Sequence, residues 1–256
     1  MLEVDGLQKT YGTGETAVEA VANISFRVEP GEFVTIVGPS GAGKSTLLRC
    51  LCGLLAPSGG SVRLNDREVV SPPPELALVF QDYTRSLMPW YTVEHNVSLP
   101  LINKVAEKSE RRERTLTALR QVGLEEFAEK YPWQLSGGMQ QRVALARGLA
   151  YRPEYLLMDE PFASVDAQTR ADLEDLVLSL RDTVDVTVVL VTHDIDESVY
   201  LADRVIVLSS RPTVVLEEVE VDLPWPRDQI DTKSLPRFVD LRGKVMRMIR
   251  DTQAQH

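Results

Sequence analysis

The sequence predicts an α/β fold with a mainly parallel central sheet, an antiparallel β subdomain and an inserted helical lobe. Two features of the chain predict it. Short apolar runs rich in Val and Ile recur along the sequence, which is typical of parallel strands buried on both faces. Between these runs, apolar residues recur with helical spacing. This succession of strand, helix and strand favours an open sheet with right-handed crossovers.

The expected elements can be placed in chain order. Apolar positions alternate within residues 1–30, which suits antiparallel strands, and Asn65-Asp66 indicates a hairpin turn. The alternating positions are Val21, Ile24, Phe26 and Val28. The predicted buried strands are 33–37, 155–158, 186–192 and 204–208. The predicted helix faces are Leu47, Cys50, Leu51 and Leu54, then Met139, Val143, Ala146 and Ala150, then Leu173, Leu176, Val177 and Leu180.

The pattern changes twice along the chain, and each change suggests a boundary. From about residue 82 to 150 helical signals dominate, so we expect an inserted helical lobe whose mixed-charge run 104–115 is a solvated helix face. After residue 210 an acidic, strand-like stretch leads to a helical segment at 236–251. The predicted organisation is therefore a core domain over 1–210 and a C-terminal extension over 211–256.

Composition limits the classes of function. The formal net charge is −10, which disfavours sequence-independent binding to nucleic acid, because that binding needs a basic surface. The N-terminal residues lack a signal pattern, and the longest aliphatic run, 186–191, is too short to cross a bilayer, so a cytosolic location is expected. Cys50 and Cys52 match neither a zinc spacing nor a disulfide framework and are predicted to be reduced, packed thiols.

Residues 38–46 form the strongest motif in the chain. They satisfy G-x-x-x-x-G-K-[ST] and lie between a predicted buried strand and a predicted helix, where a phosphate-binding loop must lie. Glycines let backbone N–H groups converge on anionic oxygens, while Lys44 faces the β and γ phosphates and Ser45 offers its hydroxyl to Mg²⁺. The predicted binding residues are Gly38, Pro39, Ser40, Gly41, Ala42, Gly43, Lys44, Ser45 and Thr46.

Acidic and imidazole side chains follow two other predicted strands. Asp159 and Glu160 end the strand at 155–158, and a Mg–nucleotide would supply the cation that two such carboxylates need. We assign Asp159 to the metal shell and Glu160 to the general base that activates water. His193 follows the strand at 186–192, at the sheet edge where ligands bind, and could contact a γ-phosphate.

Residues 135–142, LSGGMQQR, precede another predicted helix. Ser136, Gly137 and Gly138 would leave N–H groups and a hydroxyl at its positive end, which suits a second anion site. Ser136 is equally a good N-cap, so the motif by itself leaves both interpretations open.

Together these motifs resemble the ATP-binding cassette (ABC) family of transporter ATPases. The match comprises the loop 38–46 as Walker A, 155–161 as Walker B, Gln81 as the Q-loop, 135–142 as the signature, 163–166 as the D-loop and His193 as the switch histidine. The resemblance implies a P-loop NTPase fold, the cofactors ATP and Mg²⁺, and a head-to-tail homodimer with each ATP between the Walker A of one chain and the signature of the other.

The resemblance also implies roles that the residues alone leave open. Tyr11 would stack on adenine, or else be a partly buried strand tyrosine. Gln81 would reach Mg²⁺ and the attacking water. Asp166 would cross the dimer interface, act as an N-cap, or do both. Ala163 stands where the family often has Ser, so no hydroxyl contact is carried over to it.

The kind of ABC protein is suggested by further segments. The stretch between Gln81 and Ser136 suits a transporter ATPase, and residues 86–97, 209–228 and 237–242 resemble the nitrate, sulfonate, taurine and bicarbonate importer subfamily. The resemblance implies membrane-spanning permease subunits, an extracytoplasmic solute-binding protein and a peripheral location at the cytoplasmic face of the inner membrane. Residues 87–91 would be helical-lobe core or part of a groove for a permease helix. The alternative is a non-transport ABC ATPase or an ATP-switched regulatory module.

Overall fold

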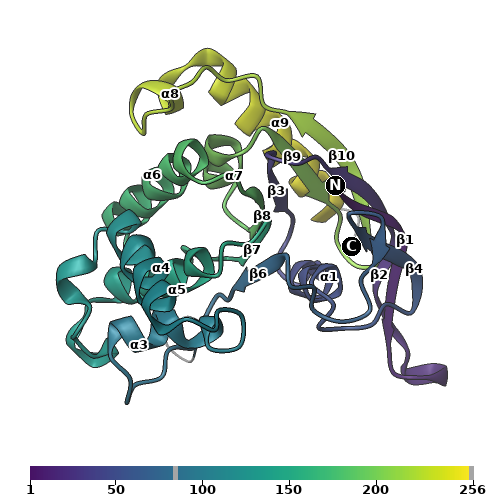
Figure 1. The fold of residues 1–256 in the computed structure, drawn as a ribbon. Helices are drawn as coiled ribbons and strands as arrows, with labels where there is room; N and C mark the ends of the chain where they lie inside the picture. Colours follow the sequence, from purple (N-terminus) through teal and green to yellow (C-terminus); the bar gives the residue numbers. More distant parts are fainter. Residues whose placement is uncertain (83–85, 254–256) are drawn as a thin grey trace. The chain divides into compact units, whose positions relative to one another are not determined.

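The computed structural model describes residues 1–82 and 86–253. The chain divides into two compact units, and Figure 1 colours it along the sequence from the N-terminus to the C-terminus. The first unit comprises Met1–Leu76 and Thr187–His256, and the second comprises Ala77–Val186.

The first unit is built around a sheet whose strands lie in the order β5-β4-β1-β2-β10-β9-β3-β8. Its strands are β1 (Leu2–Tyr11), β2 (Val18–Val28), β3 (Phe33–Val37), β4 (Gly59–Leu64), β5 (Arg67–Glu68), β8 (Thr187–Thr192), β9 (Arg204–Leu208) and β10 (Thr213–Glu220). Its helices are η1 (Gly14–Thr16), α1 (Lys44–Leu51), α7 (Ile195–Leu201), α8 (Asp231–Ser234) and α9 (Pro236–Gln253).

The parallel part of this sheet matches the predicted strands. β3 pairs in parallel with both β8 and β9, and every residue of β3 and β8 is buried. Strands covered on both faces need apolar side chains on both faces, which explains the continuous runs of Val, Ile and Leu. The predicted mainly parallel central sheet is confirmed.

The antiparallel part consists of β5, β4, β1 and β2. The four alternating positions of the opening segment, Val21, Ile24, Phe26 and Val28, are all buried. Asn65 and Asp66 both have positive φ, 48° and 63°, as a tight two-residue hairpin turn between β4 and β5 requires. The predicted antiparallel subdomain and its turn are therefore confirmed.

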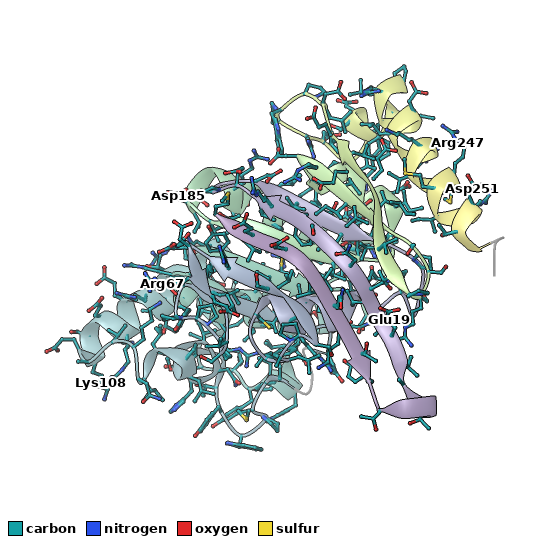
Figure 2. The ribbon with its side chains drawn as sticks, turned by 90° about the vertical axis from the view of Figure 1, so that its right-hand side faces the viewer. Glu19, Arg67, Lys108, Asp185, Arg247 and Asp251 are labelled. Atoms are coloured by element: carbon teal, nitrogen blue, oxygen red, sulfur yellow. The ribbon has the colours of Figure 1, made fainter. Side chains whose placement is uncertain are left out.

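Strand β10 brings the C-terminal segment into the sheet. It lies between β2, which it pairs in parallel, and β9, which it pairs antiparallel. The following helix α9 buries Phe238, Leu241 and Val245 and packs against α7, β9 and β10. Its exposed residues include Arg247 and Asp251, which point away from the strands in Figure 2. The predicted boundary at residue 210 thus falls between two neighbouring strands of one sheet.

The first helix is shorter than its apolar pattern predicts. Leu47, Cys50 and Leu51 are buried in α1, but Leu54 lies beyond the helix and is 52% exposed. The chain leaves the helical path at Gly53, whose φ of +70° is unfavourable for other residues. The inclusion of Leu54 in the buried face was wrong, because periodicity alone does not register this turn.

The second unit combines two neighbouring strands, β7 (Tyr155–Asp159) and β6 (Leu76–Val79), with helices. The helices are α3 (Val93–Ser98), η2 (Leu99–Leu101), α4 (Lys108–Gln121), η3 (Glu125–Phe127), η4 (Pro132–Gln134), α5 (Gly137–Ala150) and α6 (Ala167–Thr183). Helix α5 contacts α3, α4 and α6. The charge run 104–115 is largely exposed, as a solvated helix face should be. Within residues 1–82 and 86–253, no helix is long and apolar enough to span a bilayer.

Both cysteines are buried in the first unit. Cys50 and Cys52 are each 1% exposed, and neither is in a disulfide. Burial raises the pKa of Cys50 to about 11, because a thiolate would lose its hydration there. The thiol therefore stays protonated near neutral pH, and the prediction of reduced, packed thiols is confirmed.

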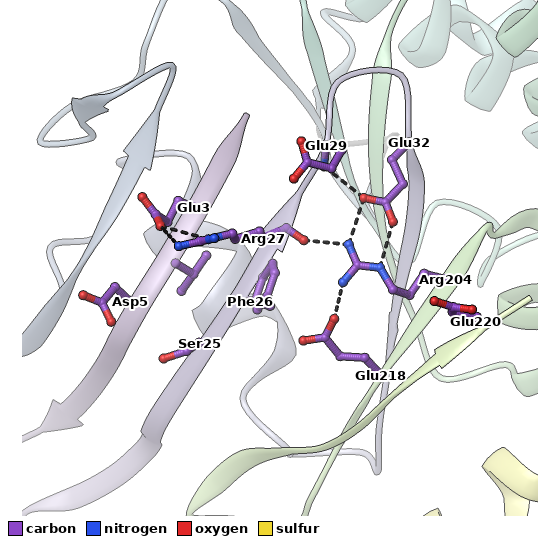
Figure 3. Close-up of a pocket in the computed structure, with 11 residues that line it drawn as sticks. Glu3, Asp5, Ser25, Phe26, Arg27, Glu29, Glu32, Arg204, Glu218 and Glu220 are labelled. Atoms are coloured by element: carbon purple, nitrogen blue, oxygen red, sulfur yellow. Dashed lines mark hydrogen bonds and ion pairs between the residues drawn. The ribbon is translucent and has the colours of Figure 1, made fainter.

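A pocket of about 740 Å³ opens on the first unit among β1, β2, β9 and β10 (Figure 3). At its edge the Arg204 guanidinium donates to both carboxylate oxygens of Glu32, at 2.7 and 2.8 Å, and to Glu218 and the Arg27 carbonyl. Hydrogen bonding to Glu32 raises the pKa of Arg204, so the charge is permanent. One side chain thereby connects three segments of the sheet.

Replacing the Arg204 guanidinium should lower the stability of the sheet. Arg204→Lys keeps the charge but cannot reproduce the bidentate geometry, so we expect the free energy of unfolding to fall by about 1–2 kcal/mol. Arg27→Lys is the matched control, because the Arg27 side chain is 65% exposed beside Glu3 and should contribute less than about 0.5 kcal/mol. Urea denaturation measures both variants. Equal midpoints would show that the Arg204 geometry adds nothing.

Candidate functional site

The glycine-rich loop 38–46 leaves β3 and enters α1 in the first unit. Gly41 and Gly43 have φ values of 79° and 76°, in the left-handed region that glycine adopts without strain. Helix α1 begins at Lys44, and its N-cap residue is Gly43, which has no side chain to cap the first turn. The first N–H groups of a helix lack intrahelical partners, so this loop is suited to hold an anion.

Lys44 lies at the base of this loop. Its side chain is almost completely buried, and its ammonium group donates to the Gly38 carbonyl at 2.9 Å and to the Pro39 carbonyl at 3.0 Å. These bonds hold the cation against the loop backbone, beside the N-terminus of α1. The arrangement fits a nucleotide phosphate, because it places a positive charge and backbone donors in one cradle.

The back of the loop is tightly packed at two of its glycines. A Cβ on Gly38 would lie 3.1 Å from Leu208, and a Cβ on Gly43 would lie 2.8 Å from the Ala20 carbonyl. The Ala42 carbonyl accepts a hydrogen bond from the Thr213 hydroxyl. The motif glycines therefore serve close packing as well as backbone conformation.

Tyr11 and His193 also lie in the first unit. Tyr11 ends β1 with 42% of its surface exposed, and its hydroxyl lies 3.2 Å from the Thr46 hydroxyl of the loop. Val37 pairs with Thr192, so Gly38 and His193 leave adjacent parallel strands at the same edge of the sheet. His193 is exposed there. The structure thus brings Tyr11, the loop and His193 to one end of these strands.

The predicted carboxylates lie in the second unit, at the end of β7. Asp159 is 9% exposed and closes the strand, and Glu160 follows it with φ of 43°. A glutamate in the left-handed region is uncommon and costs about 1 kcal/mol, so the local packing must impose this conformation. Gln81 donates its amide to the Glu160 carboxylate at 3.2 Å. Three predicted residues, Gln81, Asp159 and Glu160, therefore lie together.

The signature motif and the D-loop meet within the second unit. Ser136 caps α5 by accepting a hydrogen bond from the Met139 N–H at 3.3 Å. Asp166 caps α6, accepting from the Thr169 N–H at 3.0 Å and from its hydroxyl at 2.7 Å. These bonds lower the pKa of Asp166, because they stabilise its ionised form. Both N-cap predictions are confirmed.

Thr169 is a residue that the sequence reasoning missed. A Cβ on Gly138 would lie 2.3 Å from the Thr169 methyl group, so only glycine fits there without rearrangement. Thr169 therefore touches the signature with its methyl group and the D-loop with its hydroxyl. The only signal in the sequence is the spacing Asp-x-x-Thr, which is typical of an N-cap and indicates nothing about Gly138.

Comparisons with known proteins identify the arrangement. The family model described as ABC transporter matches residues 21–163. An uncharacterized ABC transporter ATP-binding protein of Methanocaldococcus jannaschii is 46% identical over 98% of this chain and 91% of its own length. The nitrate transport protein NasD of Klebsiella oxytoca is 37% identical over 99% of this chain and 97% of its own.

A solved structure agrees with these relatives. It is a dimeric ATP-binding cassette in a post-hydrolysis state, bound to ADP and Pi. It superposes with a TM-score of 0.76 at 36% sequence identity, covering 86% of this chain and 99% of that chain. The predicted fold class, an ABC-type P-loop NTPase, is confirmed. The chain is an ATP-binding ATPase that belongs to the ABC transporter family.

Proposed function

We propose that this chain is the ATP-hydrolysing subunit of an importer for a small anion such as nitrate, sulfonate or taurine. The observation that carries the proposal is the co-occurrence of every cassette motif, in order, in a chain that aligns over nearly its whole length with a nitrate transport protein. Two copies would bind two ATP molecules, close on them and hydrolyse them, and this cycle would drive separate membrane subunits.

The loop 38–46 would hold the nucleotide phosphates. Gly41, Gly43 and the first turn of α1 support this role through their backbone geometry, and Lys44 through its buried positive charge. Tyr11 would stack on adenine, since its half-exposed ring lies beside Thr46.

Mg²⁺ fits the residues available, because it prefers hard oxygen ligands. The Ser45 hydroxyl, the Asp159 carboxylate and the Gln81 side-chain oxygen would hold it. The ion would neutralise charge on the phosphates and help orient them.

Glu160 would act as the general base. It would take a proton from the water whose oxygen bonds to the γ-phosphorus, while the bond between that phosphorus and the ADP oxygen breaks. The hydrogen bond from Gln81 supports this role by holding the carboxylate in one orientation. His193 would donate to the transferred phosphoryl group from the sheet edge next to the loop.

The signature would complete the site in a second copy of the chain. Ser136, Gly137 and Gly138 stand at the exposed N-terminal end of the fourteen-residue helix α5, which suits contact with phosphate oxygens. Asp166 would cross the interface nearby while still capping α6. A two-fold dimer would use each surface twice, so that both ATP sites are composite.

The membrane partners would be permease subunits, with an extracytoplasmic solute-binding protein delivering the anion. The chain would then lie at the cytoplasmic face of the inner membrane. Among residues 87–91, Leu87 is buried while Trp90 is 66% exposed, so the segment has a packed and an open side. The open side would contact a helix of the permease.

This contact predicts that one substitution can remove permease binding without affecting ATP binding. Trp90→Asp should remove most of the co-purifying permease when the tagged chain is isolated from gently solubilised membranes, because aromatic anchors dominate such interfaces. ATP binding should be unchanged. Ile230→Asp is the matched control, since Ile230 is 78% exposed but far along the chain in the C-terminal segment.

Mass spectrometry of the co-purified proteins tests the wider proposal. It should identify a permease and a solute-binding protein. In a separate thermal unfolding measurement, the melting temperature of that solute-binding protein should rise with nitrate, a sulfonate or taurine. Recovery of neither protein would contradict the importer assignment. Retention of the permease by Trp90→Asp would contradict only the contact at Trp90.

A further inference from the structure

Thr213 supports the nucleotide loop from behind. It is the first residue of β10, outside the region that the family model matches, and it is completely buried. Its hydroxyl donates a hydrogen bond to the carbonyl of Ala42, which is itself buried. A buried carbonyl has little access to water, so the Thr213 hydroxyl largely decides where this carbonyl points.

The surrounding packing holds Thr213 in this place. β10 pairs in parallel with β2, with Thr213 opposite Val21, next to Ala20. A Cβ on Gly43 would lie 2.8 Å from the Ala20 carbonyl and 3.5 Å from the Thr213 hydroxyl oxygen. The Ala42–Gly43 peptide is therefore pressed against two neighbouring strands, and Thr213 supplies a directional bond to it.

The orientation of this peptide has a consequence for the cradle. In a planar trans peptide, the carbonyl of one residue and the N–H of the next point in opposite directions. A carbonyl of Ala42 that points back toward β10 therefore turns the N–H of Gly43 toward the outer side of the loop, where Ser40 and Gly41 are exposed. Backbone N–H groups on that side are the ones that can meet phosphate oxygens.

We infer that Thr213 is a positioning residue for nucleotide binding, which fixes the Ala42–Gly43 peptide so that the Gly43 N–H faces the phosphates. The inference rests on the proposed role of the loop 38–46 as the phosphate site and is independent of transport. It also gives the C-terminal segment a direct part in nucleotide affinity.

The test is isothermal titration of the full chain with ADP and Mg²⁺, at a temperature where circular dichroism finds every variant folded. Thr213→Val keeps the branched shape but removes the donor, so the dissociation constant should rise roughly 3–10-fold. Thr213→Ser keeps the hydroxyl and should stay within about twofold of wild type. This rescue distinguishes the hydrogen bond from packing.

Two further variants distinguish a failure of the Thr213 inference from a failure of the phosphate site itself. Thr35→Val is the matched control, because the Thr35 hydroxyl is equally buried and donates to the Ser198 carbonyl at 3.0 Å, away from the loop. Its affinity for ADP should not change. Lys44→Ala should abolish measurable binding, and unchanged binding would overturn the phosphate site itself together with the inference.

If Lys44→Ala abolishes ADP binding as expected, the Thr213 and Thr35 variants then decide whether the inference holds. Affinity within twofold of wild type for Thr213→Val, or an equal loss for Thr213→Ser or Thr35→Val, would overturn it. Loss confined to Thr213→Val would support it.

Discussion

Glu160→Gln should lower the steady-state rate of ATP hydrolysis at least about 100-fold, which is the usual contribution of a general base. ATP should remain bound, because the loop 38–46 and Lys44 are unaltered. Since bound ATP is no longer consumed, the variant should accumulate as an ATP-dependent dimer.

The local geometry makes this substitution specific. Glu160 follows the buried end of β7 with φ of 43° and accepts a hydrogen bond from Gln81. Glutamine has the same length, and its side-chain oxygen can still accept from Gln81. The change therefore removes the basic oxygen without removing the contact, and a loss of rate reports on proton transfer rather than on misfolding.

Phosphate release with saturating ATP and Mg²⁺ measures the rate, and size-exclusion chromatography with and without ATP measures the dimer. Glu154→Gln is the matched control, because Glu154 precedes β7 at its opposite end and is exposed. It should hydrolyse ATP like wild type. Turnover by Glu160→Gln within tenfold of wild type would remove Glu160 from the role of base.

The predictable parts of the fold are those where the local pattern and the final environment agree. β3 and β8 are buried on both faces, so their Val-rich runs are enough to predict them as buried strands. The exposure of Leu54 was not predictable in this way, because the chain turns at Gly53, where a Cβ would lie 2.5 Å from Ser71. β10 was predicted as a strand, but its place between β2 and β9 depends on long-range pairing.

The same distinction applies to the site. Lys44, Asp159 and Glu160 could be predicted because motif spacing places Lys44 at the start of the helix after β3 and the two acids at the end of β7. Thr169 and Thr213 could not, because the Thr169 methyl group contacts Gly138 and the Thr213 hydroxyl bonds to Ala42, and these partners become neighbours only after folding. Motif residues are thus recognisable in a single sequence, whereas the residues that orient them become visible only in the structure.

Ser136→Arg should abolish the ATP-dependent dimer while leaving ATP bound to the loop 38–46. The small hydroxyl at the N-terminus of α5 would be replaced by a long cation at the surface that we propose to be the dimer interface. In the proposed two-fold dimer, the substitution would occur in both composite sites. Measured in the Glu160→Gln chain, the dimer dissociation constant with ATP should rise at least about 100-fold, equivalent to about 2.7 kcal/mol.

This substitution also removes an N-cap, because the Ser136 hydroxyl accepts from the Met139 N–H. Thr92→Ala isolates that effect, since Thr92 caps α3 in the same unit by accepting from the His95 N–H at 3.2 Å. Both variants should lose about 1 kcal/mol of stability, but only Ser136→Arg should lose the dimer. If Ser136→Arg still dimerised with ATP, the signature would not lie at the interface. If Thr92→Ala also lost the dimer, the defect would come from helix stability in the second unit, and a composite site would have no support from this experiment.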